Sequence, residues 1–91
     1  MASKKIFEKD PEAVLDYEFD WSDWLEATET ISSRTVTVTG ATLDSSTAST
    51  TAVVAWVSAG TVGTTATIEC KIVTSESRTD ERTITLRIAE R

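Results

Sequence analysis

The chain is poor in the residues on which most enzyme sites depend. It has no histidine, one cysteine, one proline and three glycines in 91 residues. Histidine is the commonest general base and metal ligand, so its absence removes the usual route to acid–base or metal chemistry. A lone cysteine excludes a disulfide within the chain, so packing or partners must stabilise the fold. Cys70 follows Ala66 and Ile68 in an alternating apolar pattern, and we expect it to be a small buried side chain instead of a nucleophile.

Long apolar runs and basic residues are also scarce. No run approaches the roughly 18 apolar residues of a membrane helix, and the opening MASKKIFEKD has no apolar segment after its lysines. We therefore expect neither a membrane span nor a secretory signal, and we expect synthesis in a cytoplasm. Nine basic residues stand against fifteen acids, which gives a formal net charge of −6. Nucleic-acid binding depends on lysine and arginine that neutralise phosphates, so no nucleic acid is expected as a partner.

The charges are unevenly distributed along the chain. No basic residue lies between Asp10 and Glu29. Lysines precede this stretch, and the end of the chain carries Arg78, Arg82, Arg87 and Arg91. Such a distribution allows pairing of charges within the chain or between copies of it.

A period of two is the main pattern that the sequence does contain. From Leu15 to Trp21, apolar side chains alternate with three acids, which predicts a β-strand with one buried face over about residues 14–21. Further strands are predicted over residues 31–39, 52–57, 65–74 and 82–89. The serine- and threonine-rich residues 42–51 are predicted to be a surface loop with room for a short strand near Leu43. Gly60 and Gly63 predict a turn with positive φ.

These strands, with no sustained helical period, predict an all-β fold. At this length we expect a two-sheet antiparallel β-sandwich with an immunoglobulin-like topology, formed by residues 12–91. The apolar pairs around Trp56 predict a strand buried on both faces, with Trp56 in the place of the core tryptophan of such domains. Residues 1–11 are predicted to be an extended arm, because Pro11 favours extended geometry before it.

Partner binding is the only site function that the residues suggest. Ile6 and Phe7 are apolar in an otherwise polar arm, and with Lys4 and Lys5 they are the candidate partner-binding residues. A frayed terminus is the alternative.

No catalytic, cofactor-binding or metal residues are predicted, and no cofactor or small-molecule substrate is expected. The acids of residues 16–20 alternate along a strand and are expected to be solvated instead of paired in a cleft. No spaced calcium loop occurs in the sequence. Trp21 and Trp24 could form a carbohydrate platform, although Trp21 shares the apolar face of its strand. Whether Trp24 is exposed stays open.

Several short motifs resemble a known family. They are Asp10-Pro11, Leu15-Asp16-Tyr17, Asp20-Trp21, Trp24-Leu25, Glu29-Thr30-Ile31, the stretch from Trp56 to Gly63, and the stretches Thr74-Ser75, Arg78-Thr79 and Arg82-Thr83-Ile84. Over residues 10–89 they resemble a family of short structural proteins encoded among the virion genes of tailed bacteriophages and prophages. Ala59 and Ala66 depart from the glycine and the aromatic residue that are common in that family.

The resemblance implies a non-enzymatic component of a tailed-phage virion. We expect a capsid decoration or cement protein on the outer surface of the head, with the major capsid protein as partner and copies of this chain as a further candidate. The alternatives are a tail, connector or fibre-associated module of the same virion, and a carbohydrate-binding β-sandwich.

Overall fold

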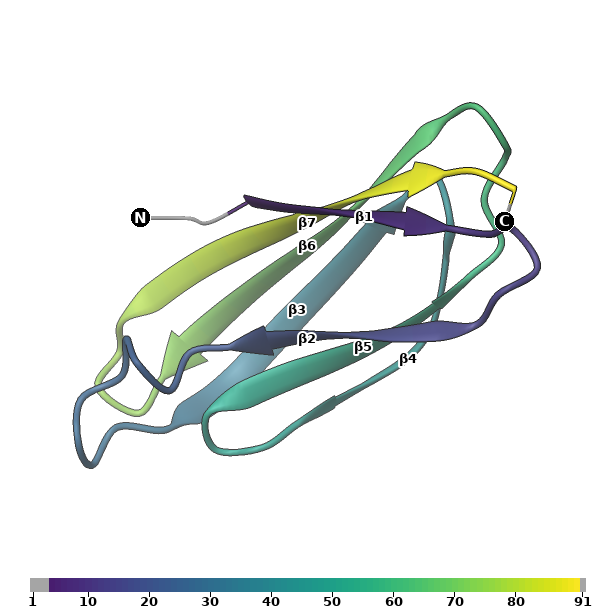
Figure 1. Ribbon diagram of the computed structural model, residues 1–91. Coiled ribbons are helices and arrows are strands. Elements are labelled where there is room, and N and C mark those ends of the chain that lie inside the picture. Colours follow the sequence, from purple (N-terminus) through teal and green to yellow (C-terminus); the bar gives the residue numbers. More distant parts are fainter. Residues whose placement is uncertain (1–3, 91) are drawn as a thin grey trace.

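Two β-sheets pack face to face around a shared apolar core (Figure 1). The structure is a computed structural model that describes residues 4–90. One sheet has the order β1-β7-β6-β3 and the other has the order β2-β5-β4. The strands are β1 (Lys4–Lys9), β2 (Leu15–Asp20), β3 (Ile31–Thr39), β4 (Thr42–Ala48), β5 (Ala52–Ser58), β6 (Thr65–Thr74) and β7 (Thr79–Ile88). No helix occurs between residues 4 and 90, so the predicted two-sheet β-sandwich is confirmed.

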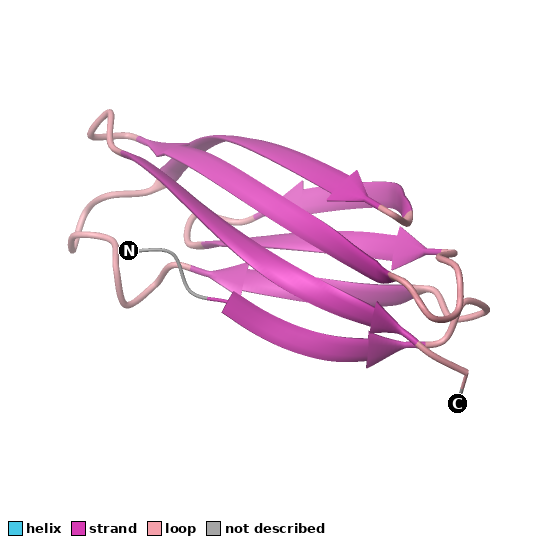
Figure 2. Ribbon diagram, turned by 90° about the horizontal axis from the view of Figure 1, so that it is seen from above, coloured by secondary structure: helices cyan, strands magenta, loops and turns pink. Residues whose placement is uncertain are grey.

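The long axes of the strands run along the molecule, and the loops lie at its two ends (Figure 2). The molecule measures 42 × 23 × 17 Å. One end carries residues 10–14, 40–41 and 59–64 and is called here the Gly60 end. The other carries residues 21–30, 49–51 and 75–78 and is called the Arg78 end. Within the described residues, no helix is long and apolar enough to cross a membrane.

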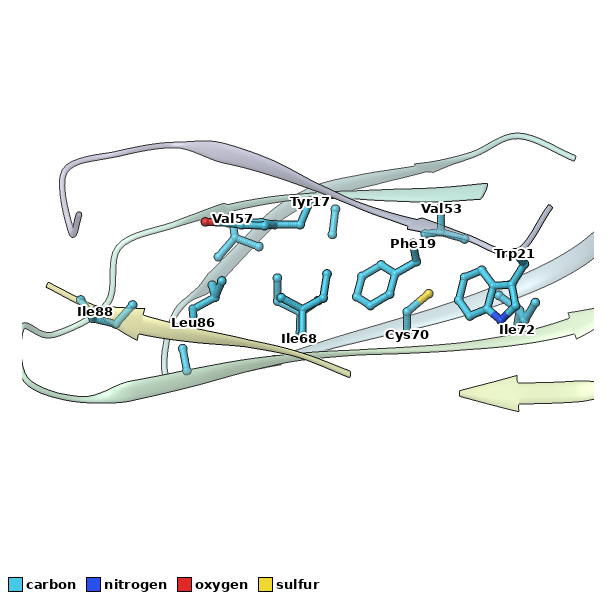
Figure 3. Close-up of a cluster of buried hydrophobic side chains, with 13 residues drawn as sticks. Tyr17, Phe19, Trp21, Val53, Val57, Ile68, Cys70, Ile72, Leu86 and Ile88 are labelled. Atoms are coloured by element: carbon cyan, nitrogen blue, oxygen red, sulfur yellow. The ribbon is translucent and has the colours of Figure 1, made fainter. Parts of the chain in front are cut away.

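The alternating residues of the strands form the core. In β6 the side chains of Ala66, Ile68, Cys70 and Ile72 are buried, as the period of two predicts. Trp21, which directly follows β2, has no exposed surface and packs beside Phe19 (Figure 3). The buried apolar side chains come from both sheets: Tyr17, Phe19, Trp21, Val53, Ala55, Val57, Ala66, Ile68, Cys70, Ile72, Ile84, Leu86 and Ile88. Burial of each large apolar side chain stabilises the fold by about 1.5–3 kcal/mol.

The loop predicted at residues 42–51 is wrong for most of its length. Residues 42–48 form β4, which pairs antiparallel with β5. Only Leu43 and Ser46 are partly buried in this strand. An edge strand needs little apolar surface when the neighbouring strand supplies its backbone hydrogen bonds. The polar composition of residues 42–48 therefore did not indicate a strand.

The predicted burial of both faces of β5 is also wrong. Val53, Ala55 and Val57 face the core, and the pleat turns Trp56 to the outer face, where 40% of its surface is exposed. Trp56 is therefore not the core tryptophan of the sandwich. The tryptophan that is fully buried in the core is Trp21, directly after β2.

The pairing of β1 departs from the expected purely antiparallel arrangement. Residues 4–9, which belong to the predicted arm, form an edge strand that runs parallel to β7. Lys9 ends this strand with its side chain fully buried, and its ammonium group donates to the carbonyl oxygen atoms of Ala59 at 2.7 Å and Asp10 at 2.9 Å. These bonds attach the end of β1 to the loop before β6.

Candidate functional site

An ion pair between the buried Glu29 and the partly exposed Arg78 organises the Arg78 end of the molecule. The carboxylate of Glu29 accepts hydrogen bonds from the guanidinium of Arg78, one of them from Nε at 2.9 Å, and from the hydroxyl of Thr74. The backbone N–H of Glu26 donates to the same carboxylate at 3.0 Å. The Arg78 guanidinium also lies over the ring of Trp24, 4.0 Å from its centroid. The long β2–β3 connection is thus held against the β6–β7 turn.

This cluster lowers the pKa of Glu29. The hydrogen bonds from Arg78 are the largest cause and bring the pKa from 4.5 to about 2, although burial acts in the opposite direction. The pKa of Arg78 is raised by the same contact. A carboxylate that stays ionised and fully engaged with a neighbouring cation has a structural role and is a poor proton donor or acceptor near neutral pH.

The cysteine and the tryptophans agree with a structural role. Cys70 is fully buried, and burial raises the pKa of its thiol to about 11, which opposes formation of a nucleophilic thiolate. Trp21 is fully buried, as expected. Trp24 is half-buried and Arg78 covers one face of its ring, so the pair Trp21 and Trp24 forms no open carbohydrate platform. In residues 4–90 no three histidine, cysteine, aspartate or glutamate side chains are grouped to hold a metal ion.

β2 is one of the four edge strands of the two sheets, together with β1, β3 and β4. β2 pairs with β5 on one side, and no strand of the described chain pairs with its other side. We call this unpaired side the β2 edge. The N–H of Trp21 bonds the carbonyl oxygen of Thr51 at 2.9 Å, which fixes the alternation of backbone bonds along the antiparallel pair. By this alternation Tyr17 and Phe19 bond β5, and the backbone groups of Asp16 and Glu18 face the β2 edge.

Arg82 closes one end of the β2 edge. Its Nη1 donates to the carbonyl oxygen of Asp20 at 2.7 Å, and its guanidinium lies 4.8 Å from the centroid of the Trp21 ring. The indole N–H of Trp21 in turn donates to Asp80 at 2.8 Å. These contacts tie the end of β2 to β7 and leave the backbone at Asp16 and Glu18 as the accessible part of the edge.

Acidic side chains line the outer face beside this edge. Asp16, Glu18 and Asp20 are exposed on that face, opposite the buried Tyr17 and Phe19. Asp16 lies directly across from Trp56, and Glu18 lies across from Val54. The outer face of this sheet therefore combines a row of carboxylates with a half-exposed tryptophan.

Apolar side chains line the other side of the β2 edge, where the two sheets open toward β1. Leu15 belongs to the inward-facing set of β2 but retains 38% exposure at the start of the strand, and the preceding Val14 is 54% exposed. Phe7 of β1 is 42% exposed and contacts Tyr17, with 5.6 Å between the ring centroids. Phe7 and Leu15 thus leave apolar surface uncovered next to an unpaired strand edge.

The predicted partner-binding residues all lie in β1. The backbone of Lys4, Lys5 and Ile6 pairs with residues 83–85 of β7, and Phe7 pairs with Leu86. Their role in partner binding stays a prediction. The β2 edge was not among the predicted sites, although the alternating acids that mark it are visible in the sequence.

The fold and these surfaces define a small all-β module with an open sheet edge. A protein-family model described as podophage GP4 fiber-tail adaptor protein gp77 matches residues 9–87 of this sequence. Because this match spans most of the chain, the chain belongs to that family of tailed-phage virion proteins. No curated protein matches the sequence.

The family match bears on the expected function. The expectation of a structural protein of a tailed-phage virion is confirmed at that level. Between the specific alternatives, the match supports the tail- or fibre-associated module and gives no support to capsid decoration or to the major capsid protein as the partner.

Proposed function

We propose that this chain is a structural adaptor that joins a fibre to the tail of a podophage particle. The observation that carries the proposal is the match of the fiber-tail adaptor family over residues 9–87. A structural adaptor acts by binding, which agrees with a thiol held in the core and a carboxylate held by Arg78.

The shape of the module supports this role. Its strands run along a 42 Å axis, and its loops lie at opposite ends. A rigid sandwich with two separated ends and an open side has room to contact two proteins at once. Repeated copies around a tail would add their individual contacts, because linked contacts raise the effective concentration of each.

We also propose that the sandwich is immunoglobulin-like. The orders β2-β5-β4 and β7-β6-β3 correspond to the B-E-D and G-F-C orders of an immunoglobulin constant domain. β1 lies beside β7 instead of beside β2, so the first strand has changed sheets relative to that arrangement. An experimental structure with a different strand order would contradict this assignment.

Deletion of the gene from the phage tests the adaptor role. We expect particles with filled heads and assembled tails that lack fibres, and we expect a plasmid copy of the gene to restore the fibres. Negative-stain imaging and quantitative mass spectrometry of purified particles measure both. The control is the deletion strain with an empty plasmid.

Copy number and location separate the alternatives. An adaptor is expected in a small ring at the tail, whereas a decoration protein is expected in hundreds of copies over the head. Fibres on the deletion particles together with loss of the chain from the head surface would reject the adaptor proposal.

A further inference from the structure

We propose that the β2 edge binds an extended segment of a partner virion protein, which adds to the sheet as a further strand with basic and apolar residues in alternation. This inference rests on the proposed function, since the segment would belong to one of the two proteins that the adaptor joins. It assigns the chemistry of the contact, which the family description does not give.

The backbone of β2 provides the hydrogen bonds for this strand. Asp16 and Glu18 present their N–H and C=O groups away from β5, as the bond from Trp21 to Thr51 establishes. An unpaired strand edge of this kind is a template for strand addition. Arg82 occupies the carbonyl oxygen of Asp20, so the added strand would end there.

The outer face determines the charge of the partner. A strand added beside β2 places alternate side chains next to Asp16 and Glu18, both exposed on that face. Opposite charges on directly neighbouring strands stabilise the pairing, and like charges oppose it. Lysine or arginine is therefore favoured at each outward position of the partner segment, with the ring of Trp56 available to a cation near Asp16.

The inner side determines the residues between the basic ones. The inward side chains of the added strand would lie over the opening between the sheets, beside Leu15 and Phe7. These side chains are 38% and 42% exposed, so apolar residues of the partner would remove their surface from water. Successive side chains of a strand point to opposite faces, so the partner segment should alternate basic residues on its outward face with apolar residues on its inward face.

A second copy of the chain is a poor occupant of the same edge. Pairing of β2 with β2 of another copy would set two rows of carboxylates side by side on one face, because Asp16, Glu18 and Asp20 all point the same way. Like charges directly opposite each other in a sheet are destabilising. Charge complementarity therefore favours a basic partner segment over self-association.

Amide hydrogen exchange measured by NMR tests the geometry in the free protein first. The amides of Asp16 and Glu18 are expected to exchange rapidly, and those of their neighbours Tyr17 and Phe19 are expected to be protected. The probe is then a synthetic peptide in which lysine and valine alternate. We expect it to bind and to protect the amides of Asp16 and Glu18. A control peptide of the same composition, with its lysines and valines in two separate blocks, is expected to bind at least about tenfold more weakly.

Two variants and a matched control separate backbone pairing from charge. Glu18→Pro removes an edge N–H and keeps the pairing with β5, so protection by the peptide should be lost. The double variant Asp16→Lys/Glu18→Lys should weaken peptide binding by about tenfold or more, because attractive cross-strand pairs become repulsive. Glu69→Lys/Glu76→Lys makes the same charge change away from β2 and should bind as the wild type does.

Three outcomes would overturn the inference. They are peptide binding without protection at Asp16 and Glu18, equal weakening by the control double variant, and dimerisation of the wild-type chain with protection of its β2 amides. Phage that carry Asp16→Lys/Glu18→Lys distinguish this inference from the adaptor role. If deletion particles lack fibres and these variant particles keep them, the β2 edge is rejected and the adaptor function stands.

Discussion

Gly60 is predicted to be the least replaceable glycine of the chain. Its φ of +107° lies in a region that side chains rarely adopt. A Cβ added there would lie 2.8 Å from Cδ1 of Ile88 and 3.0 Å from its Cγ1. Ile88 is 1% exposed and is fixed in the core, so it has little freedom to move away.

Two costs therefore combine in Gly60→Ala. Backbone strain contributes about 1–3 kcal/mol, and crowding against a packed core contributes about 1–3 kcal/mol more. Gly63→Ala is the matched control, because Gly63 has a φ of +88° and no described heavy atom lies within 4 Å of an added Cβ. Gly63→Ala should lower the free energy of unfolding only by the backbone strain, about 1–3 kcal/mol.

A double-mutant cycle isolates the crowding. Ile88→Val removes the Cδ1 atom that the new Cβ would meet, at a cost of about 0.5–1.5 kcal/mol on its own. Because the two changes relieve each other, Gly60→Ala/Ile88→Val should lose about 1 kcal/mol less than the sum of the single losses.

Urea unfolding followed by tryptophan fluorescence, to which the buried Trp21 contributes, measures these free energies. The comparison requires that the dependence of the free energy on urea concentration is the same for all variants. The reasoning is refuted if Gly60→Ala and Gly63→Ala are equally stable, or if the double variant is additive. Either result would mean that the loop moves freely away from Ile88.

Three further predictions concern the ion pair, the thiol and the tryptophans. Arg78 lowers the pKa of Glu29 to about 2. The ion pair should therefore stabilise the fold fully above about pH 4.5, and this stabilisation should fade as the pH falls toward 2. The difference in urea midpoint between wild type and Glu29→Gln, measured from pH 7 downward, should shrink over the same range. Cys70 is buried with a raised pKa, so its reaction with a thiol reagent at pH 8 should be at least about tenfold slower in the native protein than in urea. Trp21→Ala should lower the free energy of unfolding by about 3–5 kcal/mol, whereas Trp56→Ala on the outer face should cost about 1 kcal/mol, as urea titrations followed by far-ultraviolet circular dichroism will measure.

Each of these predictions has a contradicting result. Identical pH dependence of wild type and Glu29→Gln would show that the ion pair does not set acid stability. A native thiol that reacts as fast as the unfolded one would contradict the burial of Cys70. Equal losses for Trp21→Ala and Trp56→Ala would contradict the placement of Trp21 in the core and of Trp56 on the outer face.

The sequence predicted the strands whose two faces differ. The bounds of β3 and β6 agree with the predicted residues 31–39 and 65–74, because valines, isoleucines and Cys70 alternate there with polar side chains. β4 was predicted only as room for a short strand near Leu43, because both of its faces are largely polar and its stability comes from pairing with β5. Trp56 was assigned to the core because it is large and apolar. The alternation along β5 contradicts this, since Val53 and Val57 face the core and Trp56 must face the other way.

The candidate surface depends on information that no local pattern contains. The pairing of β1 with β7, and of Glu29 with Arg78, joins residues far apart in the chain. The alternation of Asp16 and Glu18 identified an exposed face, but not that the adjoining edge of β2 lacks a neighbour. Edges are a property of the whole sheet, so their position follows only from the complete strand order.

The parallel pairing of β1 with β7 orders the steps of biosynthesis. Lys4 aligns with Thr83, so β1 emerges from the ribosome long before the strand on which it will lie. Closing so long a loop is slow and entropically costly. The nascent chain must therefore hold β1 unpaired until β7 has been translated, so the four-stranded sheet gains its first strand only after its last one has formed.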